Sequence, residues 1–156
     1  MASDNQDTAT AASLQDEAEL LHPMMATDYV SHWMGVDVLA VRDGHATITM
    51  TVRKDMLNGF GTGQGGVVFA FADSAFALAC NPAHETETVT VASGVDINFL
   101  APAVLGRKLT AIANKRTQFG RSGIYDIQVL QETPEGSQEL IAEFRGRSRT
   151  VPRPKN

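Results

Sequence analysis

A single acidic side chain stands within a long apolar run near the middle of the chain. Between Gly59 and Ala83 the only ionisable groups are the Asp73 carboxyl and the Cys80 thiol. Moving an unpaired carboxylate out of water costs at least several kcal/mol, so Asp73 requires a partner, a raised pKa or a water-filled cavity. Such a carboxylate can act as a nucleophile or a general base. The alternative is structural: Asp73 hydrogen-bonds across a subunit interface or holds a loop.

Two glycines precede this acid, at the expected start of the helix that carries it. The run Gln64-Gly65-Gly66 places residues without side chains where the first N–H groups have no partner within a helix. That end of a helix favours a developing negative charge. A thioester hydrolase needs such an N–H, directed at the carbonyl oxygen as it becomes an oxyanion, together with a carboxylate. Close helix packing is the alternative explanation for the two glycines.

The elements that must position these residues follow from apolar periodicity and turn signals. Residues 65–80 are apolar on all sides, exceed the length of a normal strand and end before Pro82, which indicates a buried helix. Alternation on both sides of Asp43-Gly44 indicates a β-hairpin. We also expect short amphipathic helices within residues 13–35, broken at Pro23, with Ser13 near the first N-cap. Four more strands are expected over residues 88–100, 108–118, 123–131 and 139–150.

This order predicts an α+β fold in which a curved antiparallel sheet wraps around a long central apolar helix, because a helix without a polar face must be covered on most sides. The chain has 156 residues, 43% of them hydrophobic, which suits one domain with one core. We assign residues 13–151 to that domain and residues 1–12, which are polar and alanine-rich, to a flexible tail.

The sequence resembles the PaaI-type hotdog thioesterases of phenylacetic acid degradation. The most specific match is the run NGFGTGQGG from Asn58 to Gly66, with Asp73 at its distance from the glycine pair. Further matching segments are residues 71–77, 80–81, 91–93, 98–102, 123–127 and 144–148. The resemblance covers roughly residues 34–150. It implies a hotdog fold and hydrolysis of an acyl-CoA thioester, such as a hydroxylated phenylacetyl-CoA or a similar aryl-acyl-CoA.

The resemblance also implies roles for individual residues. Asp73 corresponds to the nucleophile or general base, Gly65 to the N–H that polarises the thioester carbonyl, and Asn58 to the residue that orients the attacking water or the carboxylate. Contacts to the substrate are expected from Gln64, Gly66 and Ser93. Relatives usually carry His where this chain has Gln64, which can donate a hydrogen bond but cannot carry a proton.

Helix geometry indicates that one chain does not complete this site. Gly65 and Asp73 are eight positions apart, which is about 12 Å along a continuous helix. A two-fold dimer with antiparallel helices would bring Asp73 of one chain opposite Gly65 and Asn58 of the other. The resemblance implies the same arrangement, and a homotetramer built from two such dimers.

Two alternatives share the fold. One is a hydratase or dehydratase acting on an enoyl or hydroxyacyl thioester, a reaction that generally uses a His beside a carboxylate. The other is a non-catalytic acyl-CoA-binding sensor, against which the presence of Asp73 argues. Basic residues on the last strand and around residue 120 could meet coenzyme A phosphates. More often, such residues form a solvated sheet face or protect a sheet edge. These residues are Lys115, Arg116, Arg121, Arg145, Arg147 and Arg149.

Several classes of protein are disfavoured. A formal net charge of -5 argues against a nucleic-acid surface. No apolar segment is long enough to suggest a membrane span, and residues 1–12 do not resemble a signal peptide. One cysteine allows no intrachain disulfide, which fits a reducing cytoplasm. No Gly-x-Ser-x-Gly motif or metal-ligand spacing is present, and no metal or cofactor is expected.

Overall fold

The computed structural model describes residues 21–155. Two short 3₁₀ segments, two helices and six strands follow one another along this part of the chain. In order they are η1 Pro23–Ala26, α2 Tyr29–Met34, β1 Asp37–Arg42, β2 His45–Thr51, η2 Lys54–Met56, α3 Gly65–Cys80, β3 Thr88–Phe99, β4 Lys108–Phe119, β5 Ser122–Glu132 and β6 Gln138–Pro152. The predicted hairpin, central helix and four later strands are confirmed within one or two residues.

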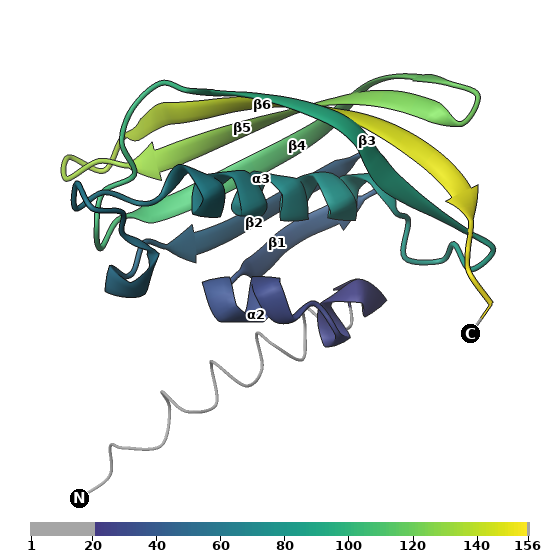
Figure 1. The fold of residues 1–156 in the computed structure, drawn as a ribbon, viewed down its shortest axis with the longest axis horizontal. Helices are drawn as coiled ribbons and strands as arrows, with labels where there is room; N and C mark the ends of the chain where they lie inside the picture. Colours follow the sequence, from purple (N-terminus) through teal and green to yellow (C-terminus); the bar gives the residue numbers. More distant parts are fainter. Residues whose placement is uncertain (1–20, 156) are drawn as a thin grey trace, which may run out of the picture.

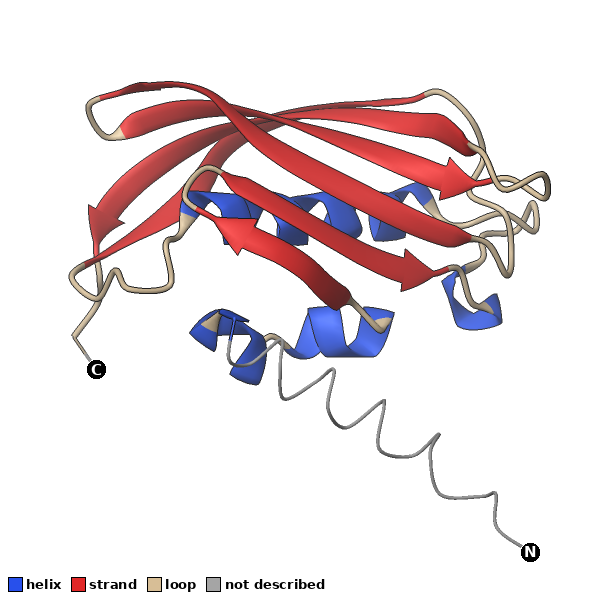
Figure 2. Cartoon of the chain, turned by 180° about the vertical axis from the view of Figure 1, so that it is seen from behind, coloured by secondary structure: helices blue, strands red, loops and turns tan. Residues whose placement is uncertain are grey.

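The six strands form one antiparallel sheet in the order β1-β2-β4-β5-β6-β3. The sheet curves over α3, and α2 lies on the side of α3 away from β4, β5 and β6 (Figure 1). Seen from behind, strands pass across α3 along most of its length (Figure 2). The predicted α+β architecture, a curved sheet around a central helix, is confirmed.

The β1–β2 hairpin turns where the sequence predicts. Arg42 pairs with His45, which leaves Asp43-Gly44 as the turn, and Gly44 has a φ of 76° that favours glycine. On β2 the side chains of Ala46, Ile48 and Met50 are buried. The Gly44 N–H also donates to the carbonyl of Ala79, 3.1 Å away, so the turn is joined to the last turn of α3.

Aromatic rings fill the space between α3 and the sheet. The ring of Phe76 lies 5.3 Å from that of Tyr125 and 5.9 Å from that of Phe144, and Phe69 lies 5.4 Å from Phe144. Gly146 of β6 makes room for them, because a Cβ there would lie 2.6 Å from ring carbons of Phe76. This aromatic cluster sets the separation between helix and sheet.

Helix α3 ends at Cys80, and the side chain of its C-cap residue, Asn81, joins it to β3. The Asn81 amide nitrogen donates to the carbonyls of Ala77 and Thr90, and its amide oxygen accepts the Thr90 N–H. Asn81 is 7% exposed, and all three bonds are between 2.8 and 2.9 Å long. Pro82, which cannot continue a helix, follows directly.

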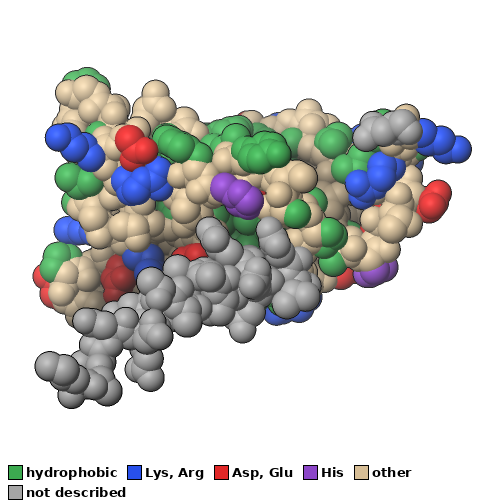
Figure 3. Space-filling view, turned by 90° about the horizontal axis from the view of Figure 1, so that it is seen from below, with side chains coloured by type: hydrophobic (Ala, Val, Ile, Leu, Met, Phe, Trp, Pro, Cys, Tyr) green, Lys and Arg blue, Asp and Glu red, His purple; other side chains and the backbone are tan. Residues whose placement is uncertain are grey.

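The region before the hairpin is divided at Pro23, as predicted. Pro23 opens η1, and α2 begins after Asp28, which caps it by accepting the Ser31 N–H. Several hydrophobic side chains of α2 are exposed, and hydrophobic surface extends across the middle of this face (Figure 3). The predicted tail and the Ser13 N-cap lie outside the described residues. No helix within residues 21–155 is long and apolar enough to cross a membrane.

Candidate active site

Asp73 lies on the face of α3 that the sheet leaves partly open. Its side chain is half-buried, as are the neighbouring Ala70 and Ala77 on the same stripe of the helix. Within residues 21–155 no hydrogen bond or ion pair reaches the Asp73 carboxylate. Desolvation by burial raises the pKa of this carboxyl above its ordinary value of 3.8. A carboxylate with a raised pKa and no paired cation among the described residues is the kind of group that can serve as a base or nucleophile.

The N-terminus of α3 presents its first N–H groups without a side-chain cap. Gln64 is the N-cap residue and its side chain makes no capping bond, while its carbonyl accepts the N–H groups of Val67 and Val68. Among the described residues, no acceptor is found for the N–H of Gly65 or Gly66. Two unpaired donors at the positive end of a 16-residue helix suit an oxyanion.

Phe99, the last residue of β3, lies directly against Gly65. A Cβ at Gly65 would lie 3.2 Å from the Cζ atom of Phe99, closer than ordinary van der Waals contact. The glycine therefore also serves close packing, which was the alternative explanation of the glycine pair. Gly66 is exposed, and the position of its absent Cβ is 3.1 Å from the Gln64 side-chain oxygen. The sequence carried no local signal that Phe99 would border this site.

The Asn58 side chain organises its own loop. Its amide oxygen accepts the N–H groups of Phe60, at 2.9 Å, and of Thr62, at 3.3 Å, and its amide nitrogen lies 3.1 Å from the Thr62 hydroxyl. The end of the loop is anchored where the Gln64 N–H donates to the Met56 carbonyl over 2.8 Å. Asn58 thus helps to set the path of the chain into α3.

The fold brings some of the predicted site residues together and separates others. One loop carries Asn58, Gln64, Gly65 and Gly66 to the N-terminal end of α3, whereas Asp73 lies two turns along the helix, about 12 Å away along its axis. Ser93 lies exposed on β3 at a bulge between Ala92 and Gly94, where its hydroxyl donates to the Arg147 carbonyl over 3.1 Å. Within one chain, Asp73 and the Gly65 N–H do not meet.

Most of the predicted basic residues pair with acids at the surface. Arg145 makes two bonds of 2.7 and 2.8 Å to Asp126, whose pKa this contact lowers, and Arg116 lies 3.4 Å from the same carboxylate. Arg147 pairs with Asp96. Lys115 pairs with Asp43, whereas Arg149 donates a hydrogen bond to the Ser122 hydroxyl over 3.2 Å. This arrangement matches a solvated sheet face.

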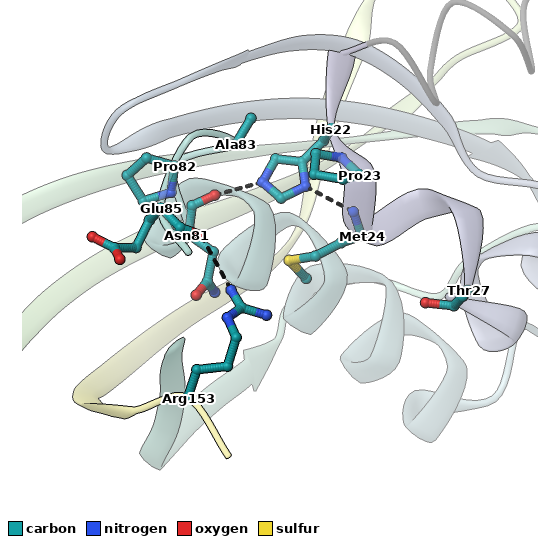
Figure 4. A pocket seen from close by; sticks show the side chains of 9 residues that line it. All are labelled: His22, Pro23, Met24, Thr27, Asn81, Pro82, Ala83, Glu85 and Arg153. Carbon is teal, nitrogen blue, oxygen red and sulfur yellow. Dashed lines mark hydrogen bonds between the residues drawn. The ribbon is translucent and has the colours of Figure 1, made fainter. Parts of the chain in front are cut away.

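A hollow of about 210 Å³ lies at the opposite end of α3 (Figure 4). Its buried His22 uses both ring nitrogens: Nδ1 accepts the Met24 N–H and Nε2 lies 2.5 Å from the Asn81 carbonyl, to which it donates. None of the predicted site residues lines this hollow. Because it lies at the end of α3 away from Gly65, it is distinct from the candidate site around Asp73 and Gly65.

Comparison with known proteins identifies the family. A family model described as the thioesterase superfamily matches residues 60–137. The acyl-coenzyme A thioesterase PaaI of Escherichia coli strain K12 is 38% identical over 130 residues, which are 83% of this chain and 88% of the relative. The chain belongs to the thioesterase superfamily. The predicted resemblance to PaaI-type thioesterases is confirmed.

Solved structures of this superfamily share the fold. The E. coli PaaI protein from the phenylacetic acid degradation operon matches with a TM-score of 0.76 and 37% identity, over 88% of this chain and 96% of that chain. A mutant of the phenylacetic acid degradation protein PaaI from Thermus thermophilus matches with a TM-score of 0.69 and 32% identity, over 78% of this chain and 98% of that chain. The predicted hotdog fold is thereby confirmed.

Proposed function

We propose that this chain hydrolyses acyl-CoA thioesters to a free acid and coenzyme A. The observation that carries the proposal is the half-buried Asp73 carboxylate, on the same helix whose first N–H groups are unpaired among the described residues. Asp73 attacks the thioester carbonyl or removes a proton from a water that does so, and the Gly65 N–H stabilises the oxyanion. The relationship to a named acyl-CoA thioesterase supports this assignment.

The proposed acyl group is an aryl-acetyl group, such as a hydroxylated phenylacetyl. Two related structures are described as phenylacetic acid degradation proteins. In this chain the Phe99 ring borders the Gly65 N–H and is 53% exposed, so it offers an aromatic face beside the reacting carbonyl. The tilted rings of Phe69, Phe144 and Phe76 close the space between α3 and the sheet, which disfavours a long aliphatic chain there.

We propose further that two chains form each site. Strand β3 is an edge of the sheet, and none of its 12 residues is fully buried. Val91 and Phe99 of β3 and the following Leu100 are 45%, 53% and 57% exposed. A second copy pairing along this edge would cover them and satisfy unpaired backbone groups. It would also bring Asp73 of one chain to Gly65 and Asn58 of the other, and two such dimers would form a tetramer.

The first prediction tests the reaction and its base. Wild-type protein should release free thiol from an aryl-acetyl-CoA faster than from benzoyl, short-chain and long-chain CoA esters. Asp73→Asn should lower kcat by about 10² or more, because the amide is neither base nor nucleophile. The matched control is Asp37→Asn, an exposed acid on β1 that should leave kcat unchanged. Hydrolysis by Asp73→Asn at the wild-type rate would refute the catalytic assignment.

The same assay separates an enzyme from a sensor. Binding of CoA esters without thiol release by the wild type would indicate a sensor.

A further inference from the structure

A chain of hydrogen bonds joins α2 to α3 directly beside Asp73. The Asp28 carboxylate accepts both the N–H of Ser31, over 3.0 Å, and its hydroxyl, over 2.7 Å. The Ser31 hydroxyl oxygen lies 3.0 Å from that of Ser74, the residue that follows Asp73 on α3. Ser31 is completely buried. Two elements that are 43 positions apart in the sequence are thus linked at the turn that carries the candidate base.

The direction of this chain follows from the chemistry of its members. An ionised carboxylate can only accept, and a serine hydroxyl has one proton to donate. The Ser31 proton is committed to Asp28, so the Ser74 hydroxyl must donate to the Ser31 oxygen. The hydroxyl protons of Ser31 and Ser74 therefore both point toward the negative charge on Asp28. This charge makes each hydrogen bond stronger than one between neutral groups, and the burial of Ser31 away from water adds to the effect.

The opposite end of α2 is held by Arg53. The two terminal guanidinium nitrogens of Arg53 donate to the carbonyls of Met34, over 3.0 Å, and Trp33, over 2.6 Å. Helix α2 has only six residues, too few to be stable in isolation, so its position depends on these contacts and on the burial of Met34. Helix α2 is therefore held at one end through Ser31 and at the other through Arg53, and it packs against the Ser74 side of α3.

From this geometry we propose that Ser31 and Ser74 are positioning residues for Asp73. The chain Asp28–Ser31–Ser74 holds the α3 turn that carries Asp73 at the place where its carboxylate reaches the thioester. This inference rests on the proposed thioesterase function. A displacement of about 1 Å in a reacting group can cost up to about 10² in rate, so one lost hydroxyl at this turn should reduce turnover.

The test is a pair of variants with the same shape. Ser74→Thr keeps the hydroxyl and Ser74→Val replaces it with a methyl group, and both carry the same β-branched penalty in a helix. We expect Ser74→Thr to keep kcat within about twofold and Ser74→Val to lose about tenfold. KM should be unchanged in both, because the proposed role of the Ser74 hydroxyl is to position Asp73 and not to contact the substrate. Equal kcat values for the two variants, with any difference confined to thermal stability, would overturn the proposal.

A second set of variants tests the chain itself. Ser31→Ala should lower kcat as Ser74→Val does, and the double variant should lose little more than either single one, since each breaks the same link. Full additivity would overturn the proposal. The control is Ser148→Ala on β6, a serine that is 1% exposed and whose hydroxyl bonds no described residue; it should keep the wild-type kcat.

Wild type and Asp73→Asn are measured alongside these variants. A wild type without thioesterase activity would refute the proposed function, and the positioning inference with it. An active wild type whose Ser31 and Ser74 variants keep full kcat would refute the positioning inference alone.

Discussion

Asp73 is held in a setting that favours its protonated form. Burial raises the pKa of its carboxyl, and no cation of the described chain offsets this effect. Its surroundings on α3 are apolar, so the same desolvation that strengthens it as a base also opposes its charge in the folded state. Asp126 experiences the reverse, because its bonds to Arg145 lower its pKa. The two carboxyls therefore affect stability in opposite directions.

The second prediction concerns stability as a function of pH. A raised pKa in the folded state means that the folded protein holds the proton more tightly than the unfolded chain does. The free energy of unfolding therefore falls as pH rises from the unfolded pKa, near 3.8, to the higher folded pKa. Asp73→Asn removes this pH-dependent loss of stability, because the amide does not ionise. Relative to wild type, the variant should gain stability as pH rises from below 3.8 to 7, measured by urea unfolding at each pH.

Asp126→Asn serves as the control with the opposite sign. Its carboxyl pKa is lowered by Arg145, so its contribution to stability is present above its unfolded pKa and is lost as pH falls through the folded one. Relative to wild type, Asp126→Asn should therefore lose stability as pH rises to 7. If Asp73→Asn shows the same trend, or none, burial does not raise the Asp73 pKa.

At the scale of elements, the spacing between α3 and the sheet depends on a glycine of β6. Phe76 on α3 occupies the space that a side chain at Gly146 would fill, and its ring packs in turn on Tyr125 and Phe144. The aromatic layer and the glycine thus act together to seat the helix that carries Asp73. A larger side chain at position 146 must be accommodated within the core, since Tyr125 and Phe144, which contact the Phe76 ring, are both buried.

The third prediction follows from this contact. Gly146→Ala places a Cβ 2.6 Å from ring carbons of Phe76, so overpacking should lower the free energy of unfolding by about 1–3 kcal/mol. Gly59→Ala is the control, because no atom lies within 4 Å of its added Cβ and Gly59 does not have a positive φ. Chemical denaturation of both variants measures the difference. Equal stability for the two would show that Phe76 can move aside without cost.

At the scale of the whole molecule, the candidate site is divided between two places on one chain. Asp73 faces the partly open stripe of α3, while Asn58 and Gly65 lie at the N-terminal end of the same helix. The exposed β3 edge runs along the same helix. A two-fold partner that covered β3 would therefore also cover the open stripe, and this links assembly to catalysis in the proposed dimer.

The last prediction tests this sharing directly. Two inactive variants, Asp73→Asn and a disabling change at the other half-site such as Asn58→Ala, are mixed, unfolded and refolded together. Random pairing makes about half of the dimers mixed, and each mixed dimer has one intact site, so about a quarter of wild-type activity should return. Subunit exchange is confirmed independently by mass spectrometry of the assembled dimers. A mixture that has exchanged subunits and remains inactive would refute the shared site.

Local patterns in the sequence were enough to determine the elements and the separation of the two candidate catalytic groups, Gly65 and Asp73. Continuous apolar character followed by Pro82 predicted α3, and alternation around Asp43-Gly44 predicted the first hairpin. These features depend on neighbours within a few residues, as do hydrogen bonds within a helix. For the same reason, the eight-residue spacing of Gly65 and Asp73 already showed that a single helix holds them apart.

Tertiary structure alone decided which distant side chains surround the site. Phe99 reaches Gly65 because β3 returns beside α3, and Ser31 reaches Ser74 because α2 packs against the Ser74 side of that helix. The ion pair of Arg145 with Asp126 depends on the register of β5 against β6. Such contacts join residues far apart in sequence, and they depend on strand order and register, which local periodicity does not encode.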